Sequence, residues 1–244
     1  MSSLLLPGDV VAPDLLPQSQ RSKTLTIGPG LRFAPPSTVT ATASGSLATD
    51  NRKNALWLEN NGQGKYIPAT GDLVIATVHH STVDYFMCSL TPYTSHAALP
   101  QLSFEGASKK TRPNLVSGSL VYARVSIASK HMDPEIECVH PSTGKADGLG
   151  ELKDGMLFDV SLGMARRLMM TKSREDGGVA VLEEFGEKGL RFEIAVGRNG
   201  KVWINSDAVQ TTLAIGKAIR ETDERDLNVE DQVKLVRKLA REAA

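Results

Sequence analysis

The 244-residue sequence is poor in aromatic side chains, carries no net charge and contains only two cysteines. Aromatic residues make up 5% of the chain, which argues against a protein that holds nucleic acid mainly by base stacking. Its 28 basic and 28 acidic residues cancel, whereas a free-standing RNA or DNA binder is usually basic. Tight binding of nucleic acid by this chain alone is therefore not expected. A neutral surface suits a subunit that is largely covered by partners.

The two cysteines, Cys88 and Cys138, are far apart, and neither has a second thiol close by in the sequence. Because both fall in apolar, strand-like runs, we expect reduced cysteines in the core. The stretch from Met1 to Asp9 lacks the basic and long apolar regions of a signal peptide. No apolar run approaches the roughly 20 residues that span a bilayer. We therefore expect a soluble protein of a reducing compartment, without membrane contact.

Changes in composition and hydrophobic pattern predict three domains, covering residues 1–66, 67–147 and 148–244. The first is rich in Pro, Gly, Ser and Thr, and short runs at 38–43 and 55–58 predict strands separated by turns. A small all-β module of this kind has little core of its own. It usually depends on a neighbour for stability.

Residues 67–147 contain about five predicted strands, and the longest connection precedes the fourth. By the two-residue period, the fourth strand places four apolar residues on one face and three other residues on the opposite face. The first set is Val121, Ala123, Val125 and Ile127, and the second is Tyr122, Arg124 and Ser126. Short strands in this number and spacing predict a closed barrel of the OB type.

The last segment, 148–244, has a mixed α/β pattern. We expect strands at 156–160, 190–196 and 201–204, helices at 165–169 and 179–185, and two closing helices. Ser206 or Asp207 is a candidate cap for the first closing helix, and Asn228 for the second. The Asn199-Gly200 pair predicts a tight hairpin between the last two strands, because both residues tolerate positive φ.

Three cations fall within four positions at Lys109, Lys110 and Arg112, in the connection before the fourth barrel strand. No apolar residue separates them, so this stretch is neither a strand nor a core helix. One interpretation is a solvated turn, because short charge runs are usually only solvated. The other is a local contact with a polyanion. The residues by themselves leave both open.

Several short stretches together resemble the RNA-binding cap subunits of the eukaryotic RNA exosome, of the type called ribosomal RNA processing protein forty. The stretches are Leu6–Asp9, Gly28–Gly30, Phe104–Pro113, Gly118–Val125, Glu135–Cys138, Asp154–Met156 and Gly197–Lys201. Each is unspecific alone, but the combination is specific and covers essentially the whole chain. The resemblance implies an N-terminal β domain, a central OB domain of the ribosomal-protein-S-one type and a C-terminal KH domain. The expected fold class is thus multidomain, mostly β plus α/β.

The resemblance also implies a function. Proteins of this kind sit on a ring of RNase-PH-like subunits. With other cap subunits they frame the entrance through which single-stranded RNA passes toward an associated exonuclease. This chain would be a non-catalytic subunit that stabilises the ring and guides RNA for 3′–5′ degradation and rRNA processing. It would reside in the nucleus and nucleolus and also in the cytoplasm.

In this interpretation the cationic loop faces the entrance, and Lys109, Lys110 and Arg112 guide phosphates without reading bases. Arg124 and Tyr122 project together from the fourth strand and supply either a backbone contact with a stacking surface or a pair packed against a neighbouring domain. Domains of the S-one type usually carry exposed aromatics and a histidine on strands two and three. Tyr85 or Phe86 fills the first position, but residues 98–100 replace the later aromatic and the histidine. We therefore expect weak, sequence-independent binding.

Residues Gly197 to Gly200 have the form of the GXXG loop with which KH domains hold nucleic-acid backbone. That loop lies between two helices, whereas this segment lies between two predicted strands. We therefore predict a structural hairpin formed by Gly197, Asn199 and Gly200, and the resemblance suggests that it lies at the contact between the KH and OB domains. Arg198 and Lys201 stay open as RNA contacts.

No residue pattern predicts catalysis, a metal site or a cofactor. His79-His80 has no Cys, Asp or Glu at ligand spacing, so we expect surface histidines. Acidic residues such as Asp72, Asp84 and Asp133 occur singly in turns. Two other hypotheses remain: an autonomous RNA-binding factor in ribosome assembly or translation and, more remotely, an OB-fold enzyme.

Overall fold

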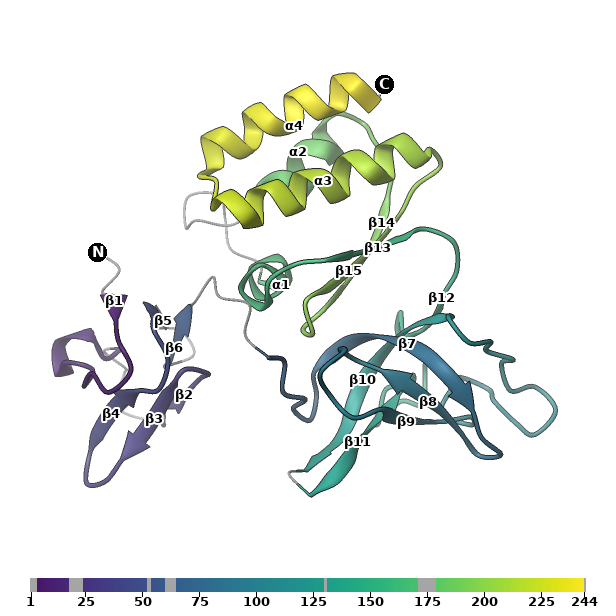
Figure 1. Ribbon diagram of the computed structural model, residues 1–244, viewed down its shortest axis with the longest axis horizontal. Coiled ribbons are helices and arrows are strands. Elements are labelled where there is room, and N and C mark those ends of the chain that lie inside the picture. The colour runs from purple at the N-terminus through teal and green to yellow at the C-terminus, as the bar shows by residue number, and fades with distance from the viewer. Residues whose placement is uncertain are drawn as a thin grey trace. The chain divides into compact units, whose positions relative to one another are not determined.

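The computed structural model describes residues 4–17, 24–51, 54–59, 65–129, 131–170 and 179–243. The chain forms two compact units, Met1–Gly62 and Gln63–Ala244, and each is described here by itself (Figure 1). Among the described residues, no helix combines the length and the hydropathy that a bilayer span requires.

The N-terminal unit consists of short strands. They are β1 (Leu4–Leu5), β2 (Thr26–Ile27), β3 (Leu31–Ala34), β4 (Thr38–Ala41), β5 (Gly45–Asp50) and β6 (Ala55–Glu59). Four of them form a sheet in the order β1-β5-β6-β2, and β3 pairs with β4. Gly28 and Gly30 let the chain pass closely over β6, because an added Cβ would lie 2.7 Å from the Cβ of Trp57 or Leu58. The small core contains Leu5, Val11, Val39, Ala41, Leu56 and Leu58.

The second unit begins with a closed β-barrel. Its strands are β7 (Leu73–Ser81), β8 (Tyr85–Ser89), β9 (Ala97–Pro100), β10 (Leu120–Ser129), β11 (Met132–Glu137) and β12 (Gly150–Leu152). The sheet order is β11-β9-β8-β7-β10-β12, and an additional pairing of β10 with β11 closes the barrel. Among the described strands of the barrel, β9 and β11 are the one parallel pair. Since β12 pairs with the first half of β10, the sheet continues past residue 147.

The face assignment within β10 is only partly as the sequence pattern predicts. Val121, Ala123 and Val125 are buried in the barrel core. Ile127, expected on the same face, is 44% exposed. The pairing of β10 with β11 shifts register between Val125 and Ile127 and again before Ser129. A bulge of this kind adds a residue to one strand and reverses the alternation beyond it, so the prediction for Ile127 is wrong.

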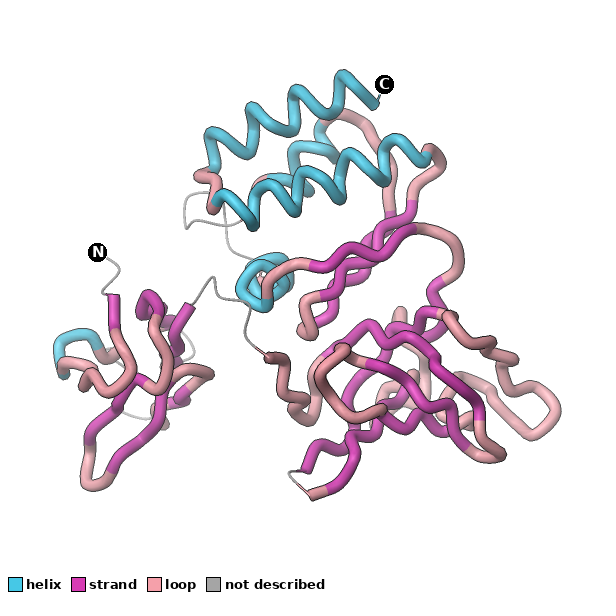
Figure 2. The backbone as a smooth tube through the Cα atoms, viewed as in Figure 1, coloured by secondary structure: helices cyan, strands magenta, loops and turns pink. Residues whose placement is uncertain are grey.

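The C-terminal part of this unit joins a three-stranded antiparallel sheet to helices that cover one of its faces (Figure 2). Its elements are β13 (Met156–Asp159), α1 (Leu162–Met169), α2 (Val181–Glu187), β14 (Glu193–Gly197), β15 (Lys201–Asn205), α3 (Val209–Arg225) and α4 (Val229–Ala243). The sheet order is β13-β15-β14.

Side chains cap two of the four described helices, α1 and α4. Ser161 caps α1 by accepting a 3.0 Å hydrogen bond from the amide of Met164. Asn228 accepts from the Asp231 amide at 2.9 Å at the start of α4, as predicted. Neither Ser206 nor Asp207 caps α3, because the helix begins one residue later and its N-cap is Ala208. The Ser206 hydroxyl instead donates to the carbonyl of Ala208 at 2.8 Å.

β15 connects two cores because its side chains alternate between opposite faces. Val202 and Ile204 pack under the helices, whereas Trp203 faces the barrel. There Trp203 forms a buried cluster with Ala195 of β14 and with Ile75, on the outer face of β7. Partly buried side chains complete this cluster: Leu120, Tyr122, Leu152 and Leu157. Apolar burial therefore joins the barrel to the C-terminal sheet.

Candidate nucleic-acid interface

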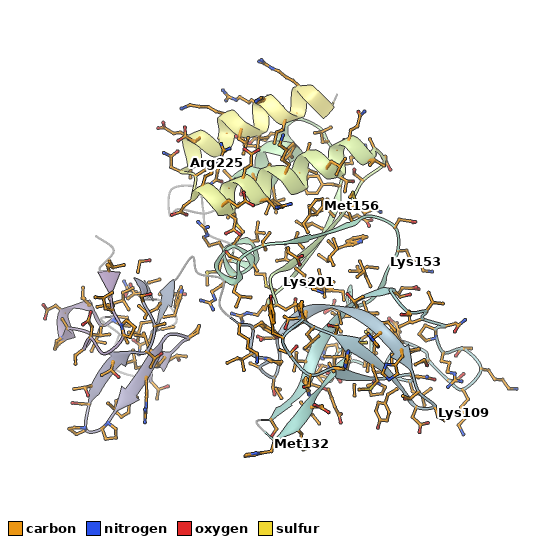
Figure 3. All side chains as sticks on the ribbon, in the orientation of Figure 1. Lys109, Met132, Lys153, Met156, Lys201 and Arg225 are labelled. Atoms are coloured by element: carbon orange, nitrogen blue, oxygen red, sulfur yellow. The ribbon has the colours of Figure 1, made fainter. Side chains whose placement is uncertain are left out.

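The connection between β9 and β10, residues 101–119 and hereafter the basic loop, is a structured turn at its cationic tip. The Ser108 and Thr111 hydroxyl groups lie 2.8 Å apart, and the Thr111 hydroxyl also donates to the Gly106 carbonyl at 3.0 Å. Lys109 and Lys110 lie between these two residues and are exposed. Figure 3 shows Lys109 projecting from the barrel. Among the described side chains, neither ammonium group has an ion-pair partner, so both are available to an external anion.

Arg112, the third cation of this stretch, is engaged within the protein. Its guanidinium donates to the side-chain carbonyl of Gln101 and, at 3.4 Å, to the carbonyl of Val83 in the β7–β8 turn. Gln101 is itself buried and donates to Ser81 and Thr82. Arg112 therefore ties the basic loop to the neighbouring turn. No pattern in the sequence indicates Gln101 as its partner.

Arg124 on β10, predicted to contact the RNA backbone, forms an ion pair with a residue of the neighbouring strand. Its guanidinium lies 2.8 Å from a carboxylate oxygen of Glu137 on β11, and it also donates to the carbonyl of Val139 at 2.8 Å. The two side chains are only 16% and 21% exposed. This geometry favours a role in holding the barrel closed over one in binding RNA.

Tyr122 lies in the joint between the barrel and the C-terminal sheet. Its hydroxyl donates to the carbonyl of Val196 at 3.2 Å, and its ring packs beside Ile75 and Trp203. Burial raises the pKa of its phenol, because the charged form loses its hydration. A half-buried ring in this cluster is not an open stacking platform. The geometry fits the alternative in which this residue packs against the neighbouring domain.

The outer face of β8 and β9 presents one aromatic ring. Phe86 is buried in the barrel core, so of the two candidates Tyr85 is the outward one, at 41% exposure. Tyr85 lies opposite Pro100, and Met87 lies opposite Ala98. Without a further aromatic residue on these paired positions, the face is a thin platform for stacking.

Three histidines gather on the barrel surface. His79 and His80 are exposed, as expected, and their Nδ1 atoms lie 3.1 Å apart. The ring centroid of His96, which the sequence did not single out, lies 4.8 Å from that of His79. Within the described part of the chain, no group of three or more His, Cys, Asp or Glu side chains has the geometry to hold a metal ion.

The Gly197–Gly200 segment forms the turn between β14 and β15 and docks on the barrel. The side chain of Asn199 is buried; its amide nitrogen donates to the carbonyls of Ile75 and Leu90, both at 2.8 Å. Its amide oxygen accepts from the backbone nitrogen of Ile75 at 3.2 Å. Gly200 has φ +77°, which suits glycine, and an added Cβ would lie 2.6 Å from the carbonyl oxygen of Val160. The turn is a structural joint.

Beside this turn, Arg198 is paired within the protein and Lys201 is partly buried. Arg198 lies 3.5 Å from a carboxylate oxygen of Asp72, which also accepts a hydrogen bond from the Tyr66 hydroxyl at 2.9 Å. Burial lowers the pKa of Lys201, and nearby Asp159 partly offsets this effect. An RNA contact by either residue stays a prediction, and the present partner of Arg198 is within the protein.

Comparison with known proteins places this geometry in a family. A family model for the exosome complex component RRP40 S1 domain matches residues 66–150, a KH-domain model matches 155–210, and a model for the Rrp40 N-terminal domain matches 25–63. The exosome complex component rrp40 of Schizosaccharomyces pombe is 36% identical over 242 residues, which is 97% of this chain and 94% of the relative. The chain belongs to the Rrp40 family.

Other comparisons agree with this membership. The Drosophila melanogaster RRP40 component is 38% identical over 89% of this chain and 88% of its own length. A crystal structure assigned to an exosome complex RNA-binding protein shares the fold with a TM-score of 0.58, at 20% identity, over 74% of this chain and all of that one. The Rrp40 S1 model covers β7 to β11 and ends at the first residue of β12, and the KH model covers β13 to the start of α3. The predicted fold class is confirmed.

Membership sharpens the interpretation of the GXXG-like turn. In a KH domain the nucleic-acid loop joins two helices, and here α1 and α2 are the helices in that place. Residues 171–178 of this connection lie outside the described residues, but their sequence, TKSREDGG, contains no GXXG pattern. The turn at Gly197–Gly200 therefore differs from the KH clamp in position, because it joins two strands. It also contacts the barrel backbone within the protein.

Proposed function

We propose that this chain is a non-catalytic cap subunit of an RNA exosome. It stabilises a ring of RNase-PH-like subunits through its N-terminal β unit and its KH domain, beside other cap subunits. Its basic loop guides single-stranded RNA toward the central channel for 3′–5′ degradation and rRNA processing. Family membership over nearly the whole chain supports the cap role. The exposed and unpaired Lys109 and Lys110 carry the guidance role.

The same geometry supports guidance in preference to tight binding. Two free lysines release few counterions, and each phosphate contact with a single strand contributes about −0.7 to the slope of log K against log salt. Arg112 and Arg124 are committed to partners in the protein, and the outer face of β8 and β9 offers one exposed aromatic ring. RNA would therefore be held by the assembled rim.

Catalysis is assigned to another subunit in this proposal. Hydrolysis of the RNA backbone commonly uses metal ions bound by carboxylates, and the described residues contain no such cluster. The exonuclease would lie beyond the channel and meet this chain only indirectly. Residence in nucleus, nucleolus and cytoplasm belongs to the same proposal, since exosomes act in these compartments.

The guidance role is tested in the assembled complex with Lys109→Glu and Lys110→Glu combined. We expect a shorter RNA segment protected from added nuclease and slower threading, with unchanged assembly. A matched control is Lys217→Glu with Arg220→Glu, which makes the same charge change on α3. Unchanged protection in the loop variant would refute guidance.

Co-purification with RNase-PH-like proteins tests the cap role separately. If the isolated chain instead bound RNA below micromolar Kd at physiological salt without joining a ring, the autonomous RNA-binding factor would be the better description.

A further inference from the structure

The exposed side of α4 carries four cations in one row. Lys234, Arg237, Lys238 and Arg241 recur at the three- and four-residue spacing that places side chains on one helix face. The opposite face is apolar, and its Val236 and Leu239 are buried in the core. Figure 3 shows nitrogen-tipped side chains along the outer side of this helix. We call these four residues the α4 row.

The neighbouring helix shows that this row is unusual for the domain. On α3, Arg220 pairs with Glu224 at 3.4 Å and Arg225 pairs with Glu221 at 3.7 Å, so its surface mixes both signs. The α4 row has one sign only, although the chain as a whole is neutral. Like charges one turn apart destabilise a helix, so the row carries a cost in the free protein.

Ion pairing and the favourable effect of cations at a helix end offset the repulsion within the α4 row only in part. Lys234 pairs with Asp231 at 2.9 Å. Cations stabilise the C-terminal end of a helix, but this effect is confined to the last turn, and among the four only Arg241 lies there. Among the described side chains, Arg237, Lys238 and Arg241 have no ion-pair or hydrogen-bond partner.

The shape and chemistry of the surface indicate its ligand. The α4 row lines an open hollow of about 420 Å³. None of the large apolar side chains exposed in the described chain lies on α4. A protein partner usually inserts apolar or aromatic anchors into its binding surface, and this face offers nothing for them to meet. Phosphates need only charge and N–H donors, which arginine and lysine supply.

We propose that the α4 row binds the phosphate backbone of RNA without regard to sequence. It is a second RNA contact, separate from the basic loop: α4 packs against α2 and α3 of the KH domain, whereas Lys109 projects from the barrel (Figure 3). The site does not depend on the proposed guidance role.

The test uses the full chain and a fluorescent oligouridine of about 20 nucleotides, long enough to cover several phosphate contacts. Anisotropy gives the affinity at a series of salt concentrations from about 50 to 200 mM. The variant combines Arg237→Gln, Lys238→Gln and Arg241→Gln, because glutamine keeps helix propensity and removes charge. Losing three phosphate contacts should make the salt slope shallower by about 2 and weaken binding several-fold at about 50 mM salt.

A matched variant controls for net charge. It combines Lys217→Gln, Arg220→Gln and Arg225→Gln on α3 and changes the total charge by the same amount. We expect its salt slope to stay close to that of the unmodified chain. Circular dichroism of both variants shows whether the helices persist, and a Lys234→Gln variant with three cations retained gives a second, milder test.

Three results would overturn the proposal. One is equal loss of RNA binding in the α3 control, which would show a general charge effect. Another is the absence of any α4-dependent binding at about 50 mM salt. The third is a labelled polyglutamate that binds the α4 row as tightly as RNA does, which would make the occupant an acidic protein segment.

The outcome is independent of the cap assignment. For a Lys109→Glu, Lys110→Glu variant measured in parallel, the slope of log K against log salt should become shallower by about 1.4. When this variant is combined with the α4 variant, the two changes in slope should add, because the two sites share no partners. If the α4 variant behaves like the unmodified chain while the loop variant still reduces RNA protection in the complex, only the α4 proposal fails.

Discussion

The basic loop and the Gly197–Gly200 turn both combine glycine with cationic residues, but their surroundings are opposite. The tip of the basic loop is held by its own hydroxyl groups, through Ser108 and Thr111, and leaves two lysines in solvent. The turn is held by the barrel: Asn199 makes three hydrogen bonds to the backbone of Ile75 and Leu90. One segment offers charge to a ligand, and the other joins two domains.

The difference shows that hydrogen-bond partners, more than residue type, decide whether such a segment can bind RNA. A buried amide that satisfies distant backbone groups cannot be released without leaving them unpaired. An exposed lysine on a self-supported turn changes partners freely. The contrast predicts that changes in the turn affect stability and that changes in the loop affect binding.

The largest effect is expected for Asn199→Ala. The substitution leaves backbone groups of Ile75 and Leu90 without their side-chain partner in a buried joint. We expect the free energy of unfolding to fall by about 3 kcal/mol. Urea denaturation followed by tryptophan fluorescence measures it, since Trp203 lies in the same joint. Arg198→Ala, whose ion pair is partly exposed, is the control and should cost less than about 1 kcal/mol. Equal costs would remove the distinction between the two neighbours.

For Gly197→Ala we expect a smaller loss than for Asn199→Ala, but a larger loss than for Gly106→Ala in the basic loop. An added Cβ at position 197 would meet the side chain of Asn199 and lie 2.7 Å from the Ile75 nitrogen. The joint must therefore open, and we expect the free energy of unfolding to fall by about 2 kcal/mol. At Gly106 the space around an added Cβ is open, and the cost of alanine comes from the φ of +65°. We expect the free energy of unfolding to fall there by about 1 kcal/mol. Thermal unfolding of both variants tests the ranking, and a larger cost at position 106 would contradict it.

Alkaline pH should weaken the joint, because the joint contains a partly buried tyrosine, Tyr122. Burial raises the pKa of Tyr122 above its ordinary value of 10.0, so the folded state keeps a proton that the unfolded state loses. The contribution of Tyr122 to stability is therefore full below pH 10 and falls as the pH rises above it, by at most about 1.4 kcal/mol per pH unit.

Urea titrations at several pH values measure this decline, and Tyr122→Phe should flatten it. Burial and the neighbouring Asp72 raise the pKa of Tyr66 in the same direction, so part of the decline should persist in the variant. A decline of the same steepness in both proteins would argue against a role for Tyr122 in the joint.

The smallest effect on stability is expected for Lys109→Glu with Lys110→Glu. Exposed, unpaired side chains usually contribute less than about 0.5 kcal/mol, so the unfolding midpoint should hardly move. Arg112→Ala differs, because it releases Gln101 and the β7–β8 turn, and should cost about 1 kcal/mol. Denaturation of the two variants side by side separates the free cations from the anchored one. A destabilised lysine variant would mean that the tip is less independent than its hydrogen bonds indicate.

Much of the fold could be predicted because its signals are local. The alternation of Val121, Ala123 and Val125 predicts a barrel strand, Asn199-Gly200 predicts a hairpin, and Asn228 predicts a helix start. The face of Ile127 was predicted wrongly because a bulge interrupts the alternation of β10. The position of a bulge depends on the pairing with the partner strand, which the sequence of β10 does not show. The predicted cap of α3 was wrong because the Ser206 hydroxyl donates a hydrogen bond to the carbonyl of Ala208 and does not accept one from a helix amide.

The candidate site was harder to predict, because charge pairing depends on strands that lie far apart in sequence. Arg124 and Lys109 have the same formal charge, and only the pairing of β10 with β11 shows that Glu137 neutralises Arg124. The α4 row is visible as a helical period in the sequence, but only the structure shows that three of its four cations have no partner among the described side chains.

The sequence by itself determined the order of the three domains, most strands and helices, and the exposure of Lys109 and Lys110, since these depend on composition and short-range periodicity. Only the tertiary structure decided which cations stay free, where Tyr122 points and what Asn199 holds. Asn199 bonds Ile75 across 124 positions of chain. Such contacts form only when the barrel and the KH sheet bury their apolar faces against each other, so packing and not sequence spacing selects the partners.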